Sequence, residues 1–300
     1  MLTLFCLFLW LGSLLGLLSP LLTPLFIHHF PTLAWLLDLA SHWQWLYAVG
    51  LVLSTLILAT RHKAWLVSLV VTALPFFTAA PLLKSASTPA KPLKLISANL
   101  YYENPDLSRL QTLVMQEQPD VLVLVEFAPQ HAALVKTWKD YPYQILQPAQ
   151  DPFGMAILSR LPLSQTETLT DQAGIQHLAT QVAYTQPIKL VGFHPIPPMT
   201  EALYITRDKI LQQLTQAPQQ PTLIAGDFNA SPWSSAFQGL ATKGFYRTLG
   251  LAPTWPHKFQ GIMGIPIDQV LASSQWQRIN AKVGTSIGSD HYPVIVELGL

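Results

Sequence analysis

The sequence predicts an α/β protein in two parts, a group of N-terminal transmembrane helices followed by a domain whose strands pair as the two sheets of a sandwich. The composition is the first reason, because 50% of the 300 residues are hydrophobic and only 11% are charged, whereas soluble domains average about 25% charged residues. The second is that positions 1–84 hold only four charged residues, and the other 29 follow. The third is that short apolar runs of strand length alternate with helical patterns after position 92.

The overall composition also excludes several classes of protein. The length allows two structural units, or one domain with a membrane attachment. A single cysteine, Cys6, excludes a disulfide-stabilised scaffold. The formal net charge of +1 provides no electrostatic attraction to nucleic acid.

Residues 1–83 form the predicted membrane domain, with three transmembrane helices. Positions 2–27, 43–60 and 64–83 contain no charged residue, and about 20 apolar residues are enough to cross a bilayer. Positions 31–40 are too few to span, so we expect them at the membrane interface with Trp35 and Trp45 as anchors. A cleaved signal peptide is the alternative for the first run. The absence of a basic n-region and the two later apolar runs argue against it.

The orientation depends on a few basic residues. Arg61 and Lys63, between the second and third runs, favour the cytoplasmic side. Everything after Leu83 then lies outside the cytoplasm. Lys84, Lys91 and Lys94 argue in the opposite direction, although they lead into a long domain, where the rule weakens. We therefore expect a multi-pass protein of the inner (cytoplasmic) membrane with an extracytoplasmic, periplasmic domain.

A polar, proline-containing linker at 84–92 is expected to connect the membrane domain to a soluble domain at 93–300. The segment VLVLVEF, at 121–127, is a continuous apolar run that predicts a strand buried on both faces. The remaining predicted strands lie at 93–100, 154–160, 188–194, 221–228, 267–273 and 291–298, and the helices at 107–118 and 202–216. Mixed strands and helices favour an α/β sandwich over a single parallel sheet.

Polar and acidic residues recur at the ends of these strands. They are Asn99, Glu126, His194, Asp227, Asn229, Asp268, Asp290 and His291. Any one of them alone would be an ordinary cap or turn residue. Because burying several unpaired carboxylates is costly, a convergent set implies a bound cation.

The oxygen-rich set favours a hard ion, Mg²⁺ or Mn²⁺, over zinc, which prefers more histidine and cysteine. Such an ion leaves coordination positions for water and phosphate oxygens, and nearby histidines can stabilise the charge that develops during in-line attack. The sequence therefore predicts the hydrolysis of a phosphate ester or anhydride.

The order of these motifs resembles the endonuclease/exonuclease/phosphatase superfamily, whose members are metal-dependent phosphohydrolases with a two-sheet α/β sandwich. The resemblance extends over about 93–300. It is carried by Asn99, PDVLVLVEF with Glu126, GMAILSR, His194, GDFN at 226–229, ID at 267–268 and SDH at 289–291.

The resemblance implies a role for each matching residue. Glu126 would bind the metal, with Asn99 and Asp290 helping to hold metal and phosphate. Asp227 would orient or deprotonate the attacking water, and Asn229 would steady the pentavalent phosphorus. His291, its tautomer set by Asp268, would donate to the scissile phosphate, and His194 would be the second donor. At position 194 the sequence has a histidine where abasic-site nucleases of the superfamily tend to have a tyrosine. In this respect it resembles the phosphodiesterase and lipid phosphatase branches.

Two short motifs, HPIPP at 194–198 and TWP at 254–256, resemble a narrower group within that superfamily. These are bacterial membrane phosphohydrolases similar to the teicoplanin-resistance type, which act on undecaprenyl pyrophosphate at the outer face of the membrane. The alternative for HPIPP is a rigid proline-rich loop without a substrate role.

The substrate class follows from charge and from the loops beside the expected site. Positions 85–300 hold 14 basic and 15 acidic residues, whereas a nuclease normally needs a basic groove. The loops are apolar, and the substrate contacts expected on them are Pro197, Pro198, Trp233, Trp255 and Met263. The alternative is that some of these residues pack in the core.

The expected partners are therefore the lipid bilayer and a lipid-linked phosphate, pyrophosphate or phosphodiester, with nucleic acid disfavoured; no protein partner can be inferred. Two other functions remain open. One is an extracytoplasmic nuclease of the same superfamily, and the other is a catalytically silent binding domain.

Overall fold

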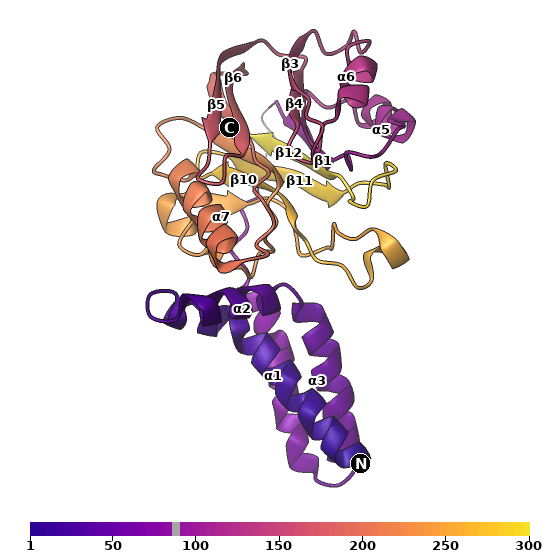
Figure 1. Cartoon of the computed structure of the whole chain (residues 1–300), viewed down its shortest axis with the longest axis vertical. Coiled ribbons are helices and arrows are strands. Elements are labelled where there is room, and N and C mark those ends of the chain that lie inside the picture. The colour runs from indigo at the N-terminus through magenta and orange to yellow at the C-terminus, as the bar shows by residue number, and fades with distance from the viewer. Residues whose placement is uncertain (86–90) are drawn as a thin grey trace.

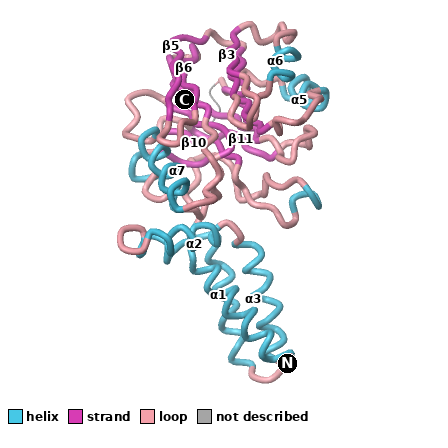
Figure 2. Tube along the Cα trace, in the orientation of Figure 1, coloured by secondary structure: helices cyan, strands magenta, loops and turns pink. Residues whose placement is uncertain are grey.

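The computed structural model describes residues 1–85 and 91–300. A β-rich domain is carried at one end of a narrow group of helices, and the N-terminus lies at the opposite end of that group (Figures 1 and 2). The first part of the chain is therefore physically separate from the sheets, except where the helices meet the domain.

The helical part contains α1 (Leu2–Phe26), α2 (Pro31–Ser41), α3 (Gln44–Ala59), the 3₁₀ helix η1 (Lys63–Ala73) and α4 (Leu74–Thr78). Within the described residues, α1 is the one helix long and apolar enough to cross a membrane by itself. The pair α2 and α3 meets the same criterion only as one broken span, because the two helices are bent by 75°.

The third predicted span is not a continuous α-helix. Its first part is a 3₁₀ helix, and the α-helical part begins only at Leu74, with Pro75 in the first turn, where its missing N–H costs nothing. After Thr78 the chain joins the β domain instead of continuing as a helix. Leu82 forms a parallel β-bridge with Arg247, and Leu83 is buried in the core between the sheets.

The same contacts change the expected position of the linker. Ser85 also forms a bridge, with Arg278, so the first residues of the predicted linker are attached to the domain. Residues 86–90 of that linker lie outside the described part of the chain.

Two six-stranded mixed sheets form the β domain. The first contains, in spatial order, β11 (Gln277–Val283), β12 (Val294–Gly299), β1 (Leu93–Asn99), β2 (Val121–Val125), β4 (Met155–Ser159) and β3 (Tyr143–Gln147). The second contains β5 (Leu163–Thr170), β6 (Gln176–Ala183), β7 (Pro187–Gly192), β8 (Thr222–Asp227), β10 (Asp268–Ser273) and β9 (Phe245–Arg247). The prediction of a two-sheet α/β sandwich is confirmed.

Side-chain alternation along the strands explains how the layers pack. In β2, Val121, Val123 and Val125 belong to the core between the sheets, whereas Leu122 and Leu124 pack on the outer face. The helices α5 (Ser108–Glu117) and α6 (Pro129–Val135) cover that outer face. The outer face of the second sheet is covered by α7 (Glu201–Leu214) and the short 3₁₀ helix η2 (Ser235–Phe237). Two more 3₁₀ helices, η3 (Ala241–Lys243) and η4 (Lys258–Gly261), lie in loops.

Strand register brings the predicted site residues to one edge of the sandwich. In the first sheet, Asn99 at the end of β1 is paired in parallel with Val125, directly before Glu126. In the second, Asp227 at the end of β8 is directly opposite Asp268 at the start of β10. Side chains from both sheets therefore converge at this edge.

Candidate active site

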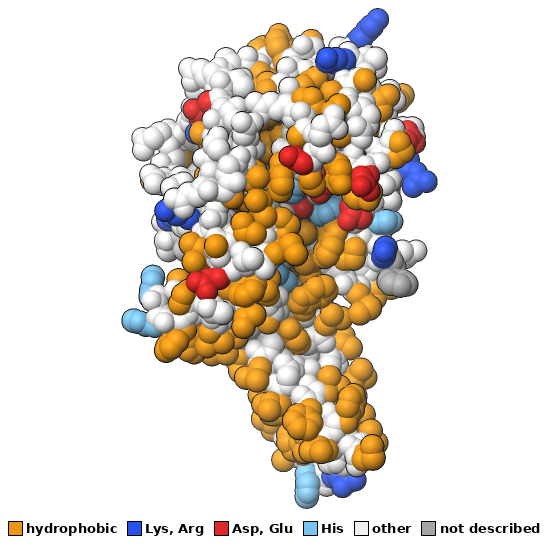
Figure 3. All heavy atoms as spheres, in the orientation of Figure 1, with side chains coloured by type: hydrophobic (Ala, Val, Ile, Leu, Met, Phe, Trp, Pro, Cys, Tyr) orange, Lys and Arg blue, Asp and Glu red, His pale blue; other side chains and the backbone are white. Residues whose placement is uncertain are grey.

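A pocket of about 750 Å³ opens at this edge of the sandwich, a volume typical of ligand sites. Acidic and histidine side chains gather there, bordered by hydrophobic side chains (Figure 3). The lining combines the β domain with the helical part; it consists of Leu39, His42, Trp43, Tyr101, Tyr102, Glu126, Pro152, Phe153, His194, Pro197, Pro198, Met199, Asp227, Asn229, Trp255, Ile265, Ile267, Asp290 and His291.

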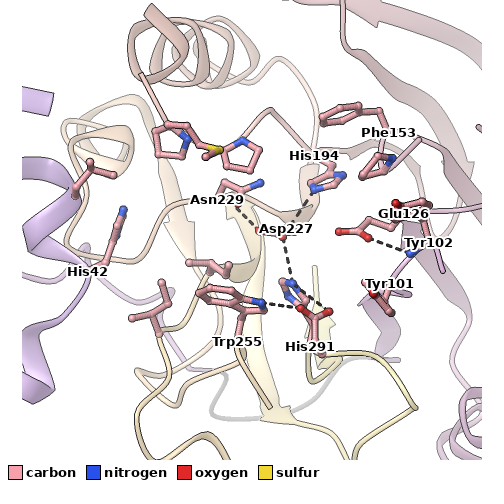
Figure 4. Close-up of a pocket in the computed structure, with 18 of the residues that line it drawn as sticks. His42, Tyr101, Tyr102, Glu126, Phe153, His194, Asp227, Asn229, Trp255 and His291 are labelled. Carbon is pink, nitrogen blue, oxygen red and sulfur yellow. Dashed lines mark hydrogen bonds and ion pairs between the residues drawn. The ribbon is translucent and has the colours of Figure 1, made fainter. Parts of the chain in front are cut away.

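Glu126 directly follows β2 and has a left-handed backbone conformation, with φ 54°. A non-glycine residue in that region stores strain of about 1–3 kcal/mol, here compensated by two hydrogen bonds to its carboxylate. Asn99 Nδ2 donates to Oε1 at 2.8 Å and the backbone N–H of Tyr102 donates to Oε2 at 3.0 Å. Burial raises the pKa of Glu126. The turn therefore aims an acidic side chain into the pocket (Figure 4).

The GDFN segment forms the turn that positions Asp227. Gly226 has φ 150°, and a Cβ there would fall 2.0 Å from the carbonyl oxygen of Phe193, so only glycine fits. Asn229 is also left-handed, with φ 47°. Its backbone N–H donates to Asp227 Oδ1 at 2.8 Å, and its Nδ2 donates to the Pro195 carbonyl at 3.0 Å. These contacts leave Oδ2 of Asp227 facing the two histidines.

Two imidazoles flank that oxygen (Figure 4). The Nε2 atoms of His194 and His291 each lie 3.8 Å from Asp227 Oδ2. His291 Nδ1 lies 2.8 Å from Asp268 Oδ2, a contact that orients the ring. The opposition of Asp268 and Asp227 across β10 and β8 creates this arrangement.

The three buried groups have strongly shifted pKa values. Burial lowers the pKa of His194 to about 3, so this imidazole is neutral. Burial would lower the pKa of His291 as well, but the surrounding carboxylates, Asp268 foremost with Asp227 and Asp290, together outweigh it and raise the pKa to about 10. Burial, reinforced by the charge of Asp268, raises the pKa of Asp227 to about 7. The site thus places a neutral and a cationic imidazole beside an acid that titrates near neutrality.

The donor atoms fit a hard divalent cation. Glu126, Asp227, Asp268 and Asp290 are gathered around His291, so the described acidic groups outnumber the imidazolium that faces them. Ligand-type atoms of Asp227, Asp268 and His291 lie within 4.8 Å of one another. His291 Nδ1 and Asp268 Oδ2 are already hydrogen-bonded to each other. Glu126, with Asn99 beside it, adds two carboxylate oxygens that each accept one hydrogen bond, and oxygen atoms are the ligands that a hard divalent ion prefers.

Of the five substrate contacts expected from the sequence, three line the pocket. They are Pro197, Pro198 and Trp255. The Trp255 ring lies 6.2 Å from the His291 ring, centroid to centroid, and its Nε1 donates to Asp290 Oδ2 at 2.9 Å. Trp233 and Met263 are not part of the lining.

The structure gives a reason for each exception. Trp233 is buried between the two parts of the molecule, where its Nε1 donates to the Pro75 carbonyl at 2.8 Å and its ring packs edge-on against Trp45. This burial leaves Trp233 no surface for a substrate. Met263, 54% exposed, lies outside the pocket on the loop that follows η4.

Sequence reasoning missed the pocket residues that come from the helices. Leu39, His42 and Trp43 lie where α2 meets α3. The sequence prediction placed Leu39 at the membrane interface and Trp43 at the start of the second span, and none of the three near the active site. A signal was present, because Asp38 and His42 are ionisable residues four positions apart in a mostly apolar stretch. Such spacing places both on one helix face, which a lipid contact would not favour. Tyr102 and Phe153, also in the lining, gave no comparable signal.

Residues 96–291 match the profile of the Endonuclease/Exonuclease/phosphatase family. A search of curated proteins finds no match. Among solved structures, an endonuclease/exonuclease/phosphatase from Beutenbergia cavernae has a TM-score of 0.60 at 19% identity, covering 70% of this chain and 72% of that one. D. rerio TDP2 complexed with a single-strand DNA product has a TM-score of 0.58 at 19% identity, covering 70% and 100%.

The 3'-5' exonuclease NExo from Neisseria meningitidis has a TM-score of 0.55 at 18% identity, covering 69% of this chain and 100% of that one. At these identities the likeness concerns the fold. The match spans the β domain, and the residues before position 96 lie outside the family profile.

Proposed function

Because the chain belongs to the Endonuclease/Exonuclease/phosphatase family of metal-dependent phosphoesterases, we propose that it is a membrane-anchored hydrolase of a lipid-linked phosphate, pyrophosphate or phosphodiester. The proposed cofactor is Mg²⁺ or Mn²⁺. Undecaprenyl pyrophosphate and phospholipids are the candidate substrates, in line with the resemblance of HPIPP and TWP to teicoplanin-resistance phosphohydrolases.

The main support for this proposal is the polarity and charge of the residues that line the pocket. It joins the acidic and histidine cluster to an apolar lining, and none of the residues described as lining it is lysine or arginine. A protein that binds a nucleic-acid backbone gains most of its affinity by neutralising several phosphates with basic side chains. A single phosphate attached to a hydrocarbon chain requires one polar end and an apolar remainder, and this pocket has both.

Each side chain of the site has its own proposed role in the reaction. Glu126 and Asn99, with Asp290, would hold the divalent ion, which when bound neutralises phosphate charge and supplies an activated water. Asp227, with a pKa of about 7, is suited to accept the proton of the attacking water near neutral pH. His291, oriented by Asp268, and His194 are placed to donate hydrogen bonds to the phosphate oxygens. Asn229 would steady the phosphoryl group.

The helical part supports attachment to a membrane. The 25 residues of α1 span about 37 Å at 1.5 Å per residue, enough for a hydrocarbon core. Arg61 lies between α3 and η1, and Lys63 is the first residue of η1, at the end of the helices far from the β domain, where Figure 3 shows basic side chains. We propose that this end is cytoplasmic, that α3 and the η1–α4 segment also cross the bilayer, and that the active site faces the periplasm.

A second candidate, a nuclease, is favoured by the named fold relatives, of which one was complexed with a DNA product and another is an exonuclease.

A substrate panel distinguishes the lipid phosphohydrolase from the nuclease. Purified full-length protein would be offered undecaprenyl pyrophosphate, common phospholipids, single-stranded DNA and duplex DNA, with Mg²⁺ and with EDTA. We expect EDTA-sensitive turnover of a lipid. Cleavage of DNA alone would favour the nuclease, and no turnover at all would favour a silent binding domain.

A further inference from the structure

The end of the pocket opposite Glu126 is built by the membrane helices. We define the elbow as residues 39–43, where α2 ends and α3 begins. His42 of the elbow lies across the pocket from Glu126, with Asp227, Asn229 and Trp255 between them (Figure 4). We infer that the elbow is a binding site for the hydrocarbon chain of the substrate, contacted by Leu39 and Trp43; this inference rests on the proposed lipid substrate.

The residues at this end have the chemistry that a hydrocarbon chain requires. Leu39 and Trp43 are half-buried, so each keeps some surface free in the cavity that also contains Asp227 and His291. Met199, Ile265 and Ile267 add further apolar lining. Apolar surface left open in a concave site gains free energy when another apolar group covers it. A lipid with its phosphate beside Asp227 can therefore place its chain against the elbow.

The elbow is fixed to the β domain by polar contacts. His42 Nδ1 lies 2.8 Å from Ser231 Oγ and accepts from the Ser231 backbone N–H at 3.3 Å. On α2, one turn before the elbow, Trp35 Nε1 donates to the carbonyl oxygen of Pro198, a pocket residue, at 2.7 Å. Buried polar groups are costly unless paired, so these contacts hold the apolar side chains of the elbow at a defined distance from the acidic cluster.

The position of the elbow also explains how a chain would reach the pocket. α3 continues from the elbow directly into the segment that we propose lies in the bilayer. The substrate chain can therefore run from the pocket past the elbow and along α3 into the lipid. Because hydrocarbon stays in contact with hydrocarbon along this path, a long-chain substrate need not be lifted out of the membrane.

The test compares two substrates that share one reacting group. Full-length protein in detergent would be assayed with Mg²⁺ on undecaprenyl pyrophosphate and on dimethylallyl pyrophosphate, and in parallel on phosphatidic acids of long and short acyl chain. For Leu39→Ala and Trp43→Ala we expect kcat/KM on the long-chain substrates to fall by about 10-fold or more, with short-chain turnover changed less than about twofold. The matched control is Leu36→Ala, one turn earlier on α2 and 51% exposed outside the pocket, which should change neither.

A second variant, Leu39→Trp, keeps the test decisive if the alanine variants fold poorly. A larger side chain should fill the apolar end and exclude long chains while short-chain substrates still turn over. Equal losses on long and short chains, or no loss on either, would overturn the inference and leave the proposed hydrolase intact. No metal-dependent turnover of any of these substrates by the unmodified protein would instead remove the proposed function.

Discussion

Arg207 on α7 donates from Nη2 to Oδ2 of Asp38 on α2 at 2.8 Å, and both side chains are completely buried. The remaining polar atoms around this ion pair are also satisfied. Asp38 Oδ1 accepts from the Ser235 backbone N–H at 2.7 Å, and Arg207 contacts Asp208 at 2.7 Å. A charge inside an apolar helix is costly unless paired, so this network explains why α2 packs on the β domain.

Removing Arg207 should therefore destabilise the whole protein. Arg207→Met leaves the carboxylates of Asp38 and Asp208 close together without their cation, and breaking a buried pair in this way costs about 3–5 kcal/mol. Thermal unfolding of the full-length protein in detergent measures the effect. The control is Lys189→Met, which breaks the exposed Lys189–Glu167 contact at 3.5 Å and should cost about 0–1 kcal/mol. Equal effects would show that the buried pair contributes no more than a surface one.

The contact between His291 and Asp268 gives a second prediction. His291→Ala should slow turnover by at least about 10²-fold, because one transition-state donor is lost. Asp268→Asn should slow it less, since it disturbs only the orientation and charge of the ring. If Asp268 acts through His291, the double variant should be no slower than His291→Ala alone. If kcat of the double variant instead falls by the product of the two single losses, Asp268 acts independently of His291.

Glu126 gives a third prediction, on metal dependence. Glu126→Gln preserves the shape of the side chain but removes its charge, so Mg²⁺-dependent turnover should fall by at least about 10²-fold while the unfolding temperature changes little. Calorimetric titration with Mg²⁺ should show weaker binding. Glu167→Gln, at an exposed position on β5, is the matched control and should leave turnover and Mg²⁺ binding unchanged. Near-normal turnover in Glu126→Gln would exclude Glu126 from the metal site.

The candidate active site was accessible to sequence reasoning because its residues follow strand ends. Once Asn99, Glu126 and Asp227 are assigned to the ends of buried strands, the pairing of those strands brings them together. The turn geometry was not accessible in the same way. The left-handed φ of Glu126, for example, depends on hydrogen bonds from Asn99 and Tyr102 that no local pattern encodes.

The junction between the two parts could not be predicted because it depends on contacts between distant segments. Asp38 and Arg207 are 169 positions apart, so the polar residues of α2 indicate a face not covered by lipid but do not identify the segment that covers it. Trp233 illustrates the consequence. Its surroundings suggested a substrate loop, whereas its burial results from the packing of Trp45 and Pro75, which belong to the helices.

The loop that follows η4 gives a final prediction, about contact with the membrane surface. Ile262 and Met263 are 79% and 54% exposed, and the loop extends from the domain on the side nearer the helices (Figure 1, orange). Because exposed apolar side chains near a bilayer insert into its interface, Ile262→Ser with Met263→Ser should slow turnover of lipid in vesicles more than turnover of a soluble phosphate ester. Met115→Ser, 70% exposed on α5 away from the helices, is the matched control and should change neither rate. Equal slowing on both substrates would mean that the loop supports the active site and not the membrane contact.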